Sequence, residues 1–235
     1  MSSVTSIYGG KDPRELPFYT LTDVASFLRV PRSTLGAWCG QKTYALVQGE
    51  RKRMAPLLRL DRKSKRLTFH NLVEAYVVFS LTRSFQIPLP LLRSALASLD
   101  GDRPLLDQRF YARKGEMFVE IANRVLVDVC RSPGQTLVRD FVESSLERIE
   151  FDGAQRPERF HPWRESVDEP KVVSIDARRA FGRPTVVGRS LKVEVIVDLR
   201  RAGEEIATIA RNYDLKPKLI EGVLKWSGYG SGAAS

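Results

Sequence analysis

The segment YTLTDVASFLRVPRSTLGAWCG, residues 19–40, predicts two short helices separated by a tight turn. Apolar residues recur at helical spacing in its first half, with Thr22 in the position of an N-cap and Asp23 in the first turn. Pro31 ends that helix, because the residue before a proline is disfavoured in the α conformation. Gly40 is a natural stop for the second helix. These proportions are those of a helix-turn-helix.

The second helix of this pair carries small and cationic groups near its N-terminus. It begins at Arg32 or Ser33 and buries Leu35 and Trp38, which lie three residues apart. Arg32, Ser33 and Thr34 then face outward, and side chains of this kind suit the major groove of DNA and its phosphates. An amphipathic helix pair is also a common structural unit without a ligand, so this pattern alone leaves both interpretations open.

The positive charge of the chain is concentrated in its N-terminal third. The 235 residues carry a formal net charge of +10. Residues 1–70 hold 13 Lys and Arg against 5 Asp and Glu, a balance of +8; residues 71–150 hold 10 against 11, a balance of −1; residues 151–235 hold 15 against 12, a balance of +3. The distribution indicates a polyanionic partner for the N-terminal third, although basic surfaces also serve solubility alone.

Two basic clusters follow the helix pair. Apolar residues at 57–60 and 67–69 flank a polar stretch at 61–66, which predicts a hairpin with a basic tip where the wing of a winged helix-turn-helix lies. The clusters are candidates for phosphate contacts on either side of a groove, and the alternative is a solvated charged loop. The cationic members are Arg51, Lys52 and Arg53 in the first cluster and Arg62, Lys63, Lys65 and Arg66 in the second.

The rest of this region completes a winged helix-turn-helix DNA-binding domain, which we assign to residues 1–100. Residues 1–18 contain glycines and prolines and are expected to lack regular structure. Residues 71–85 and 91–99 are expected to form helices. The first of these is strongly apolar and is expected to pack under the helix pair.

Residues 101–151 are assigned to a central α+β block. Strands are expected within 109–121 and 124–130, and an amphipathic helix at 137–149. The near-neutral charge of the block favours packing or self-association over nucleic-acid binding.

A compact C-terminal unit is expected at residues 172–228, after a linker at 152–171 that holds three prolines and many charges. It contains three helices: one at 193–201, one that ends at Tyr213, and one that begins at Lys216-Pro217. The second and third again have helix-turn-helix proportions. The whole chain is therefore predicted to be α+β and mainly helical.

Composition narrows the class of protein further. No apolar run approaches the roughly 18 residues that a membrane helix needs, and the N-terminus has no signal-sequence pattern, so a soluble cytoplasmic protein is expected. Cys39 and Cys130 are expected to be small core residues, and His70 and His161 to be solvated or hydrogen-bonded, with no metal site and no cofactor.

The C-terminal unit resembles the small uncharacterised trihelical domain found in many bacterial antitoxins. The matching positions are Gly182-Arg183-Pro184, Gly188, Ala202-Gly203, Ile209-Ala210, Tyr213 and Leu215. Gly188-Arg189-Ser190 departs from the Gly-Thr-Arg that is common in that family. The N-terminal stretch more loosely resembles a MerR-like winged helix-turn-helix, and the combination is similar to the long VapB-type antitoxins of mycobacteria.

This resemblance implies an antitoxin of a type II toxin–antitoxin system. Such a protein autorepresses its operon by binding operator DNA and neutralises a PIN-domain ribonuclease toxin of the VapC type. Because helix-turn-helix proteins are commonly two-fold dimers, a homodimer is expected. Toxin inhibition usually inserts side chains, often arginine, among the acidic metal ligands of the PIN site. The residues expected to make that contact are Arg156, Arg159, Trp163 and Arg164.

Two other classes of function are weighed against the antitoxin. A MerR-like ligand-responsive transcriptional regulator would use the central block as an effector pocket lined by Phe110, Tyr111 and Phe118, although such residues are more often plain core. An enzyme is not expected, because the sequence contains no phosphate-binding loop, no metal-ligand cluster and no nucleophile–histidine arrangement.

Overall fold

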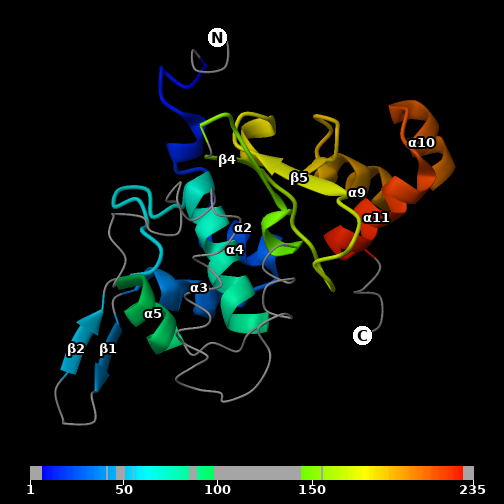
Figure 1. The fold of residues 1–235 in the computed structure, drawn as a ribbon. Helices are drawn as coiled ribbons and strands as arrows, with labels where there is room; N and C mark the ends of the chain where they lie inside the picture. Colours follow the sequence, from blue (N-terminus) through cyan, green and yellow to red (C-terminus); the bar gives the residue numbers. More distant parts are fainter. Residues whose placement is uncertain are drawn as a thin grey trace. The chain divides into compact units, whose positions relative to one another are not determined.

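The computed structural model describes residues 7–40, 42–45, 51–54, 56–84, 89–97, 144–154 and 156–229 (Figure 1). The chain divides into two compact units, Met1–Pro157 and Glu158–Ser235. Helices and antiparallel strands occur together, so the predicted α+β class is confirmed. The strands expected within 109–121 and 124–130, and residues 137–143 of the helix expected at 137–149, lie outside the described residues.

The N-terminal unit contains the predicted helix pair and the two helices expected after it. α4 and α5 each begin two residues before the predicted start. The helical elements of this unit are η1 (Pro13–Glu15), α2 (Leu21–Leu28), α3 (Arg32–Cys39), α4 (Phe69–Ser84) and α5 (Leu89–Ala97).

α2 begins with a capping box and ends with a left-handed residue. The Thr20 hydroxyl accepts a hydrogen bond from the Asp23 amide at 3.1 Å, and Asp23 accepts one from the Thr20 amide at 2.8 Å. The predicted cap at Thr22 was therefore two residues late. Arg29, at φ 49°, ends the helix, and α3 starts three residues later.

α4 is the central element of the N-terminal core. Its side chains from Phe69 to Leu81 are all buried, on every side of the helix. A helix that is buried all round needs neighbours on several faces. α2 and η1 both contact α4, so the expected packing of this helix under the pair is confirmed for α2.

The predicted hairpin is in a different place. β1 (Lys42–Ala45) pairs antiparallel with β2 (Arg51–Met54), whereas residues 61–66 form a closed turn. Leu67 does not pair with 57–60 but forms a bridge with Tyr19. The prediction was wrong because alternation of apolar residues does not identify the partner of a strand.

The described part of the N-terminal segment, residues 7–18, contains a short 3-10 helix, contrary to the prediction. The Asp12 side chain caps η1, and the Arg14 side chain is only 1% exposed. Arg14 donates hydrogen bonds to Asp12 and, across 138 residues of sequence, to Asp152 at 2.8 Å. The Asp-Pro pair at 12–13 is the local signal for this helix start, with Asp12 as the N-cap and Pro13 at the first helical position.

The later strands are β3 (Ile149–Phe151) in the first unit, and then β4 (Pro157–Phe160), β5 (Val173–Asp176) and β6 (Thr185–Val186), which lie side by side in that order. β4 pairs antiparallel with β5, and β5 with β6. Residue 149 therefore belongs to a strand and not to the predicted helix. The range expected to be a linker contains β4 and the division between the two units.

The three helices predicted for the C-terminal unit are present. They are α9 (Val193–Arg201), α10 (Ile206–Tyr213) and α11 (Pro217–Ser227), and each contacts the other two (Figure 1). The core that they share contains Ile196, Val197, Ile209, Ile220 and Val223. α11 also lies against the chain just before β5, since a Cβ on Gly222 would come within 2.8 Å of the Val172 side chain.

Candidate nucleic-acid interface

The start of α3 presents polar groups to solvent, as the sequence predicts. Arg32 and Ser33 are exposed and Thr34 is half-buried, whereas Leu35 and Trp38 are buried. This division follows from helical periodicity on a short amphipathic helix.

The opposite end of α3 is fixed by hydrogen bonds to its last carbonyl groups. The amides of Leu57 and Leu58 donate to the Trp38 carbonyl at 2.8 and 3.2 Å. The guanidinium of Arg93, from α5, donates to the Ala37 carbonyl at 2.9 Å. The C-terminus of α3 is thus held inside the unit while its N-terminus remains accessible.

Residues 61–66 form a compact turn organised by one carboxylate. Asp61 accepts hydrogen bonds from the amides of Ser64 at 2.6 Å and Lys63 at 3.1 Å, and its own amide donates to the Arg66 carbonyl at 2.9 Å. The hydrogen bonds from Ser64, with that from Lys63 and its charge, lower the pKa of Asp61. The turn is therefore a defined structure and not a loose loop.

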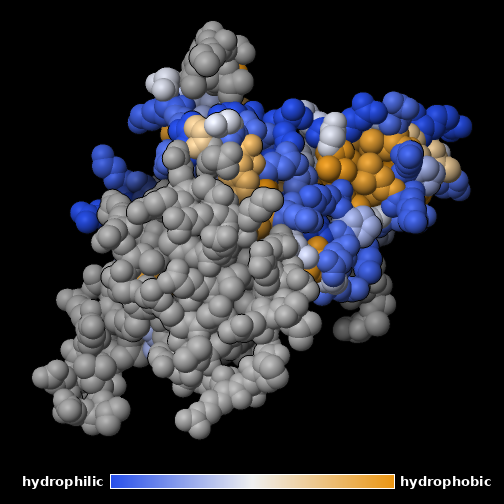
Figure 2. Space-filling view, in the orientation of Figure 1, coloured by the Kyte–Doolittle hydropathy of each residue, from blue (hydrophilic) through white to orange (hydrophobic). Residues whose placement is uncertain are grey.

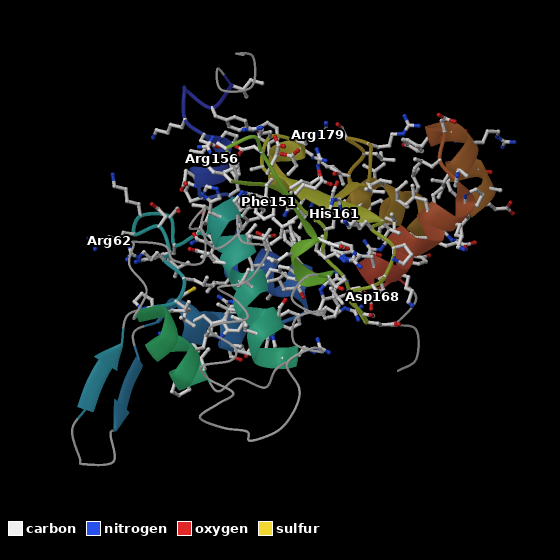
Figure 3. The ribbon with its side chains drawn as sticks, in the orientation of Figure 1. Arg62, Phe151, Arg156, His161, Asp168 and Arg179 are labelled. Atoms are coloured by element: carbon white, nitrogen blue, oxygen red, sulfur yellow. The ribbon has the colours of Figure 1, made fainter. Side chains whose placement is uncertain are left out.

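The turn exposes a cluster of cations. Arg62, Lys63, Lys65 and Arg66 are all exposed, and Figure 3 shows Arg62 at the outer edge of this region. Of these four, Arg66 is tied back to the unit, because its guanidinium donates to the Phe18 carbonyl at 3.2 Å. We call these four residues the basic turn.

The basic turn and the start of α3 lie at opposite ends of α2. The bridge between Tyr19 and Leu67 places the basic turn beside the first residues of α2, with amide-to-carbonyl distances of 3.0 and 2.7 Å. Arg32 follows the last residues of the same helix. Eight residues of α-helix span about 12 Å. The two cationic sites are therefore separated in space by roughly the length of one short helix, α2.

The first predicted cluster lies in β2. In the register of the hairpin, Arg51 is opposite Ala45, Lys52 opposite Tyr44 and Arg53 opposite Thr43. The cluster is therefore one strand of the hairpin that follows the helix pair, and not a segment in front of a later hairpin.

The four residues expected to contact a toxin differ in accessibility. Arg156 has half of its side chain exposed and forms ion pairs with Asp152 at 3.3 Å and Asp12 at 3.8 Å. The other three belong to the C-terminal unit. Arg159 is paired with Asp176 at 3.4 Å and Trp163 is half-buried, whereas Arg164 is buried.

Arg164 is engaged inside the C-terminal unit. Its Cζ lies 3.9 Å from the centre of the Trp226 ring, and its Nε donates to the Trp226 carbonyl at 2.6 Å. Its backbone amide donates to Glu169 at 3.0 Å. Arg164 therefore stabilises the C-terminal unit by joining residues 164–169 to the end of α11, and the sequence pattern alone does not indicate this role.

The two histidines are hydrogen-bonded, as predicted, whereas Cys39 is half-buried and not a core residue. His70 Nδ1 lies 2.6 Å from Glu15, and His161 Nδ1 lies 3.1 Å from the Val173 carbonyl. Burial raises the pKa of the Cys39 thiol to about 11. Within the described ranges there is no group of three or more His, Cys, Asp or Glu residues placed to bind a metal, and no helix long and apolar enough to cross a membrane.

Comparison with known proteins relates the chain to antitoxins. Residues 173–226 match the family described as "Protein of unknown function (DUF433)". The chain is 28% identical over 232 residues to a Mycobacterium tuberculosis protein named "Putative antitoxin VapB45", covering 89% of this chain and 93% of that protein. The predicted resemblance to antitoxins is therefore supported.

A solved structure shares the fold. The X-ray crystal structure of Rv2018 from Mycobacterium tuberculosis aligns with a TM-score of 0.62 and 22% identity, covering 89% of this chain and 98% of that one. At this level of identity the similarity concerns the fold alone.

Proposed function

We propose that this protein is a cytoplasmic antitoxin of a type II toxin–antitoxin pair, which neutralises a PIN-domain ribonuclease of the VapC type and represses its own operon as a homodimer. The observation that carries the proposal is the 28% identity to a protein named as an antitoxin, because it extends over 89% of the chain. Co-purification with the product of the neighbouring gene, and relief of the growth arrest that this gene causes, are the direct tests. A neighbouring product that neither binds nor arrests growth contradicts the proposal.

DNA binding is assigned to a winged helix-turn-helix formed by α2, α3 and the β1–β2 hairpin. In this proposal Arg32, Ser33 and Thr34 contact the major groove, and the basic turn and the cluster Arg51–Arg53 contact phosphates. The roughly 12 Å between the ends of α2 is similar to the width of the major groove of B-DNA, about 12 Å. A separation of this size lets the basic turn contact phosphates at the edge of the groove that the start of α3 enters.

Replacing Lys63 and Lys65 together by glutamine is expected to weaken binding to every DNA sequence about tenfold. Each lost phosphate contact lowers the slope of log K against log salt by about 1, so the slope is expected to fall by about 2. The measurement is a titration of a duplex from upstream of the gene, and of a mixed-sequence duplex, at several salt concentrations. The matched control is Lys11→Gln with Arg83→Gln, two exposed cations elsewhere in the same unit. An equal loss in the control, or an unchanged slope, contradicts the assignment.

The toxin contact is proposed for the segment around Arg156, Arg159, Trp163 and Arg164 together with the C-terminal unit. Figure 2 shows an apolar area on the C-terminal unit that is bordered by hydrophilic residues, and apolar patches of this kind are often protein-binding sites. Arg156 is the exposed member of the set and Trp163 is its aromatic member, so Arg156→Ala and Trp163→Ala are the informative changes. Full toxin binding by both variants contradicts this placement.

A further inference from the structure

The turn between α10 and α11 gathers exposed cations. Arg211 lies in the last turn of α10, Lys216 directly precedes α11, and Lys218 lies in its first turn. All three are exposed, and in the part of the chain that the structure describes none of them forms an ion pair. Their charges are therefore available to a partner.

A fourth cation is brought to the same turn from another part of the unit. The Arg189 guanidinium donates to the Asp214 carbonyl at 3.1 Å and to the Asp214 carboxylate at 3.0 Å. Asp214, at φ 51°, is the left-handed residue that ends α10. The single carboxylate of the turn is thus already paired, and a positive excess remains around it.

The helices on either side of this turn have the proportions of a helix-turn-helix. α10 has eight residues, α11 has eleven, and residues 214–216 join them. α11 directs Ile220, Val223 and Leu224 into the core, whereas Lys218 and Glu221 are exposed. A recognition helix is built in this way, with a buried apolar stripe and a polar face that begins near its N-terminus.

We propose that the α10–α11 turn is a second DNA-contacting surface, which binds phosphates through Arg211, Lys216 and Lys218. The inference rests on the proposed function, because it adds a second contact to a chain that binds DNA through its N-terminal unit. Lysine and arginine on a helix-turn-helix suit the phosphates of a duplex, and Glu221 is of a type that accepts a hydrogen bond from cytosine. Two modules in one chain raise the affinity for a DNA site through effective concentration.

The test is salt-dependent DNA binding by the full-length chain carrying Lys216→Gln and Lys218→Gln. The slope of log K against log salt is expected to fall by about 2, with roughly tenfold weaker binding. The matched control removes two exposed cations elsewhere in the unit, Lys171→Gln with Arg201→Gln, and is expected to change the slope little. Lys216→Arg with Lys218→Arg is expected to keep wild-type binding, and thermal unfolding verifies that each variant is folded.

The outcomes separate this inference from the proposed function. If the Lys63 and Lys65 variant lowers the slope and the Lys216 and Lys218 variant does not, DNA binding by the N-terminal unit stands and the second surface is overturned. If both variants lower it, the inference is supported. A wild-type chain that does not bind duplex DNA overturns both proposals. If the Lys216 and Lys218 variant binds single-stranded RNA more weakly but binds duplex DNA as the wild type does, the choice of DNA as the partner of this surface is overturned.

Discussion

Replacement of Arg14 by methionine is expected to lower the free energy of unfolding of the N-terminal unit by about 3–5 kcal/mol. The guanidinium donates to Asp12 through Nε and Nη2, at 3.0 and 2.6 Å, and to Asp152 through Nη1 at 2.8 Å. It also donates to the Pro157 carbonyl at 3.3 Å. Methionine keeps much of the volume but leaves two carboxylates without the cation that lies between them.

The neighbouring Arg156 provides a matched control. It forms ion pairs with the same two carboxylates, at 3.3 and 3.8 Å, but about half of its side chain is exposed. Exposed ion pairs contribute about 0–1 kcal/mol, so Arg156→Met is expected to have a small effect. Hydrogen exchange of the α2 and α4 amides measures both variants in the full chain. Equal losses in the two variants contradict the argument.

The same network predicts a pH dependence. Burial alone raises the pKa of Asp152, but hydrogen bonds from the Arg156 amide and the Arg14 side chain outweigh it, and the pKa lies well below its ordinary 3.8. The pKa of Asp12 is lowered in the same direction, again by Arg14 against the effect of burial. Because the folded pKa values are depressed, this stabilisation is present above about pH 4 and is lost as the pH falls further. Arg14→Met is expected to reduce that acid sensitivity.

The elements that the sequence predicts well are those with local signals. The bounds of α9 are as predicted, and α10 and α11 end and begin at Tyr213 and Pro217 as expected. Each has an apolar stripe at helical spacing, and a proline opens α11. The exposure of Arg32 and Ser33 at the start of α3 follows from the same periodicity.

The features that the sequence does not reveal depend on partners far away in the chain. Leu67 forms a bridge with Tyr19 and not with residues 57–60. Arg14 donates a hydrogen bond to Asp152, which lies 138 residues later in the sequence. The charge and proline content of residues 152–171 predicts a linker, because the sequence does not show ion pairs with distant residues, such as that of Arg159 with Asp176. Periodicity describes one element at a time, so it identifies helices and faces but not the pairing between them.

Arg164→Ala is expected to lower the melting temperature of the C-terminal unit by about 10–20 °C, which corresponds to a loss of about 2–4 kcal/mol. The change removes the stacking of the guanidinium 3.9 Å over the Trp226 ring. It also leaves the Trp226 carbonyl without the hydrogen bond from Arg164 Nε at 2.6 Å. Arg164→Lys is expected to recover little of the loss, because an ammonium lacks the planar fork that stacks and donates at the same time.

The adjacent pair of Lys225 and Glu165 is the control for Arg164, since it joins the same two segments on the exposed surface at 3.2 Å. Lys225→Ala is expected to change stability by less than about 1 kcal/mol. Scanning calorimetry of the full chain measures the unfolding of the C-terminal unit in each variant.

The effect of Arg164→Ala on stability also bears on the toxin contact, because Arg164 is one of the four residues expected to make it. Loss of toxin binding by Arg164→Ala without any loss of stability contradicts the structural role. Loss of both assigns the effect to the Arg164–Trp226 stack, and leaves Arg156, Arg159 and Trp163 as the members of the set proposed to contact a toxin.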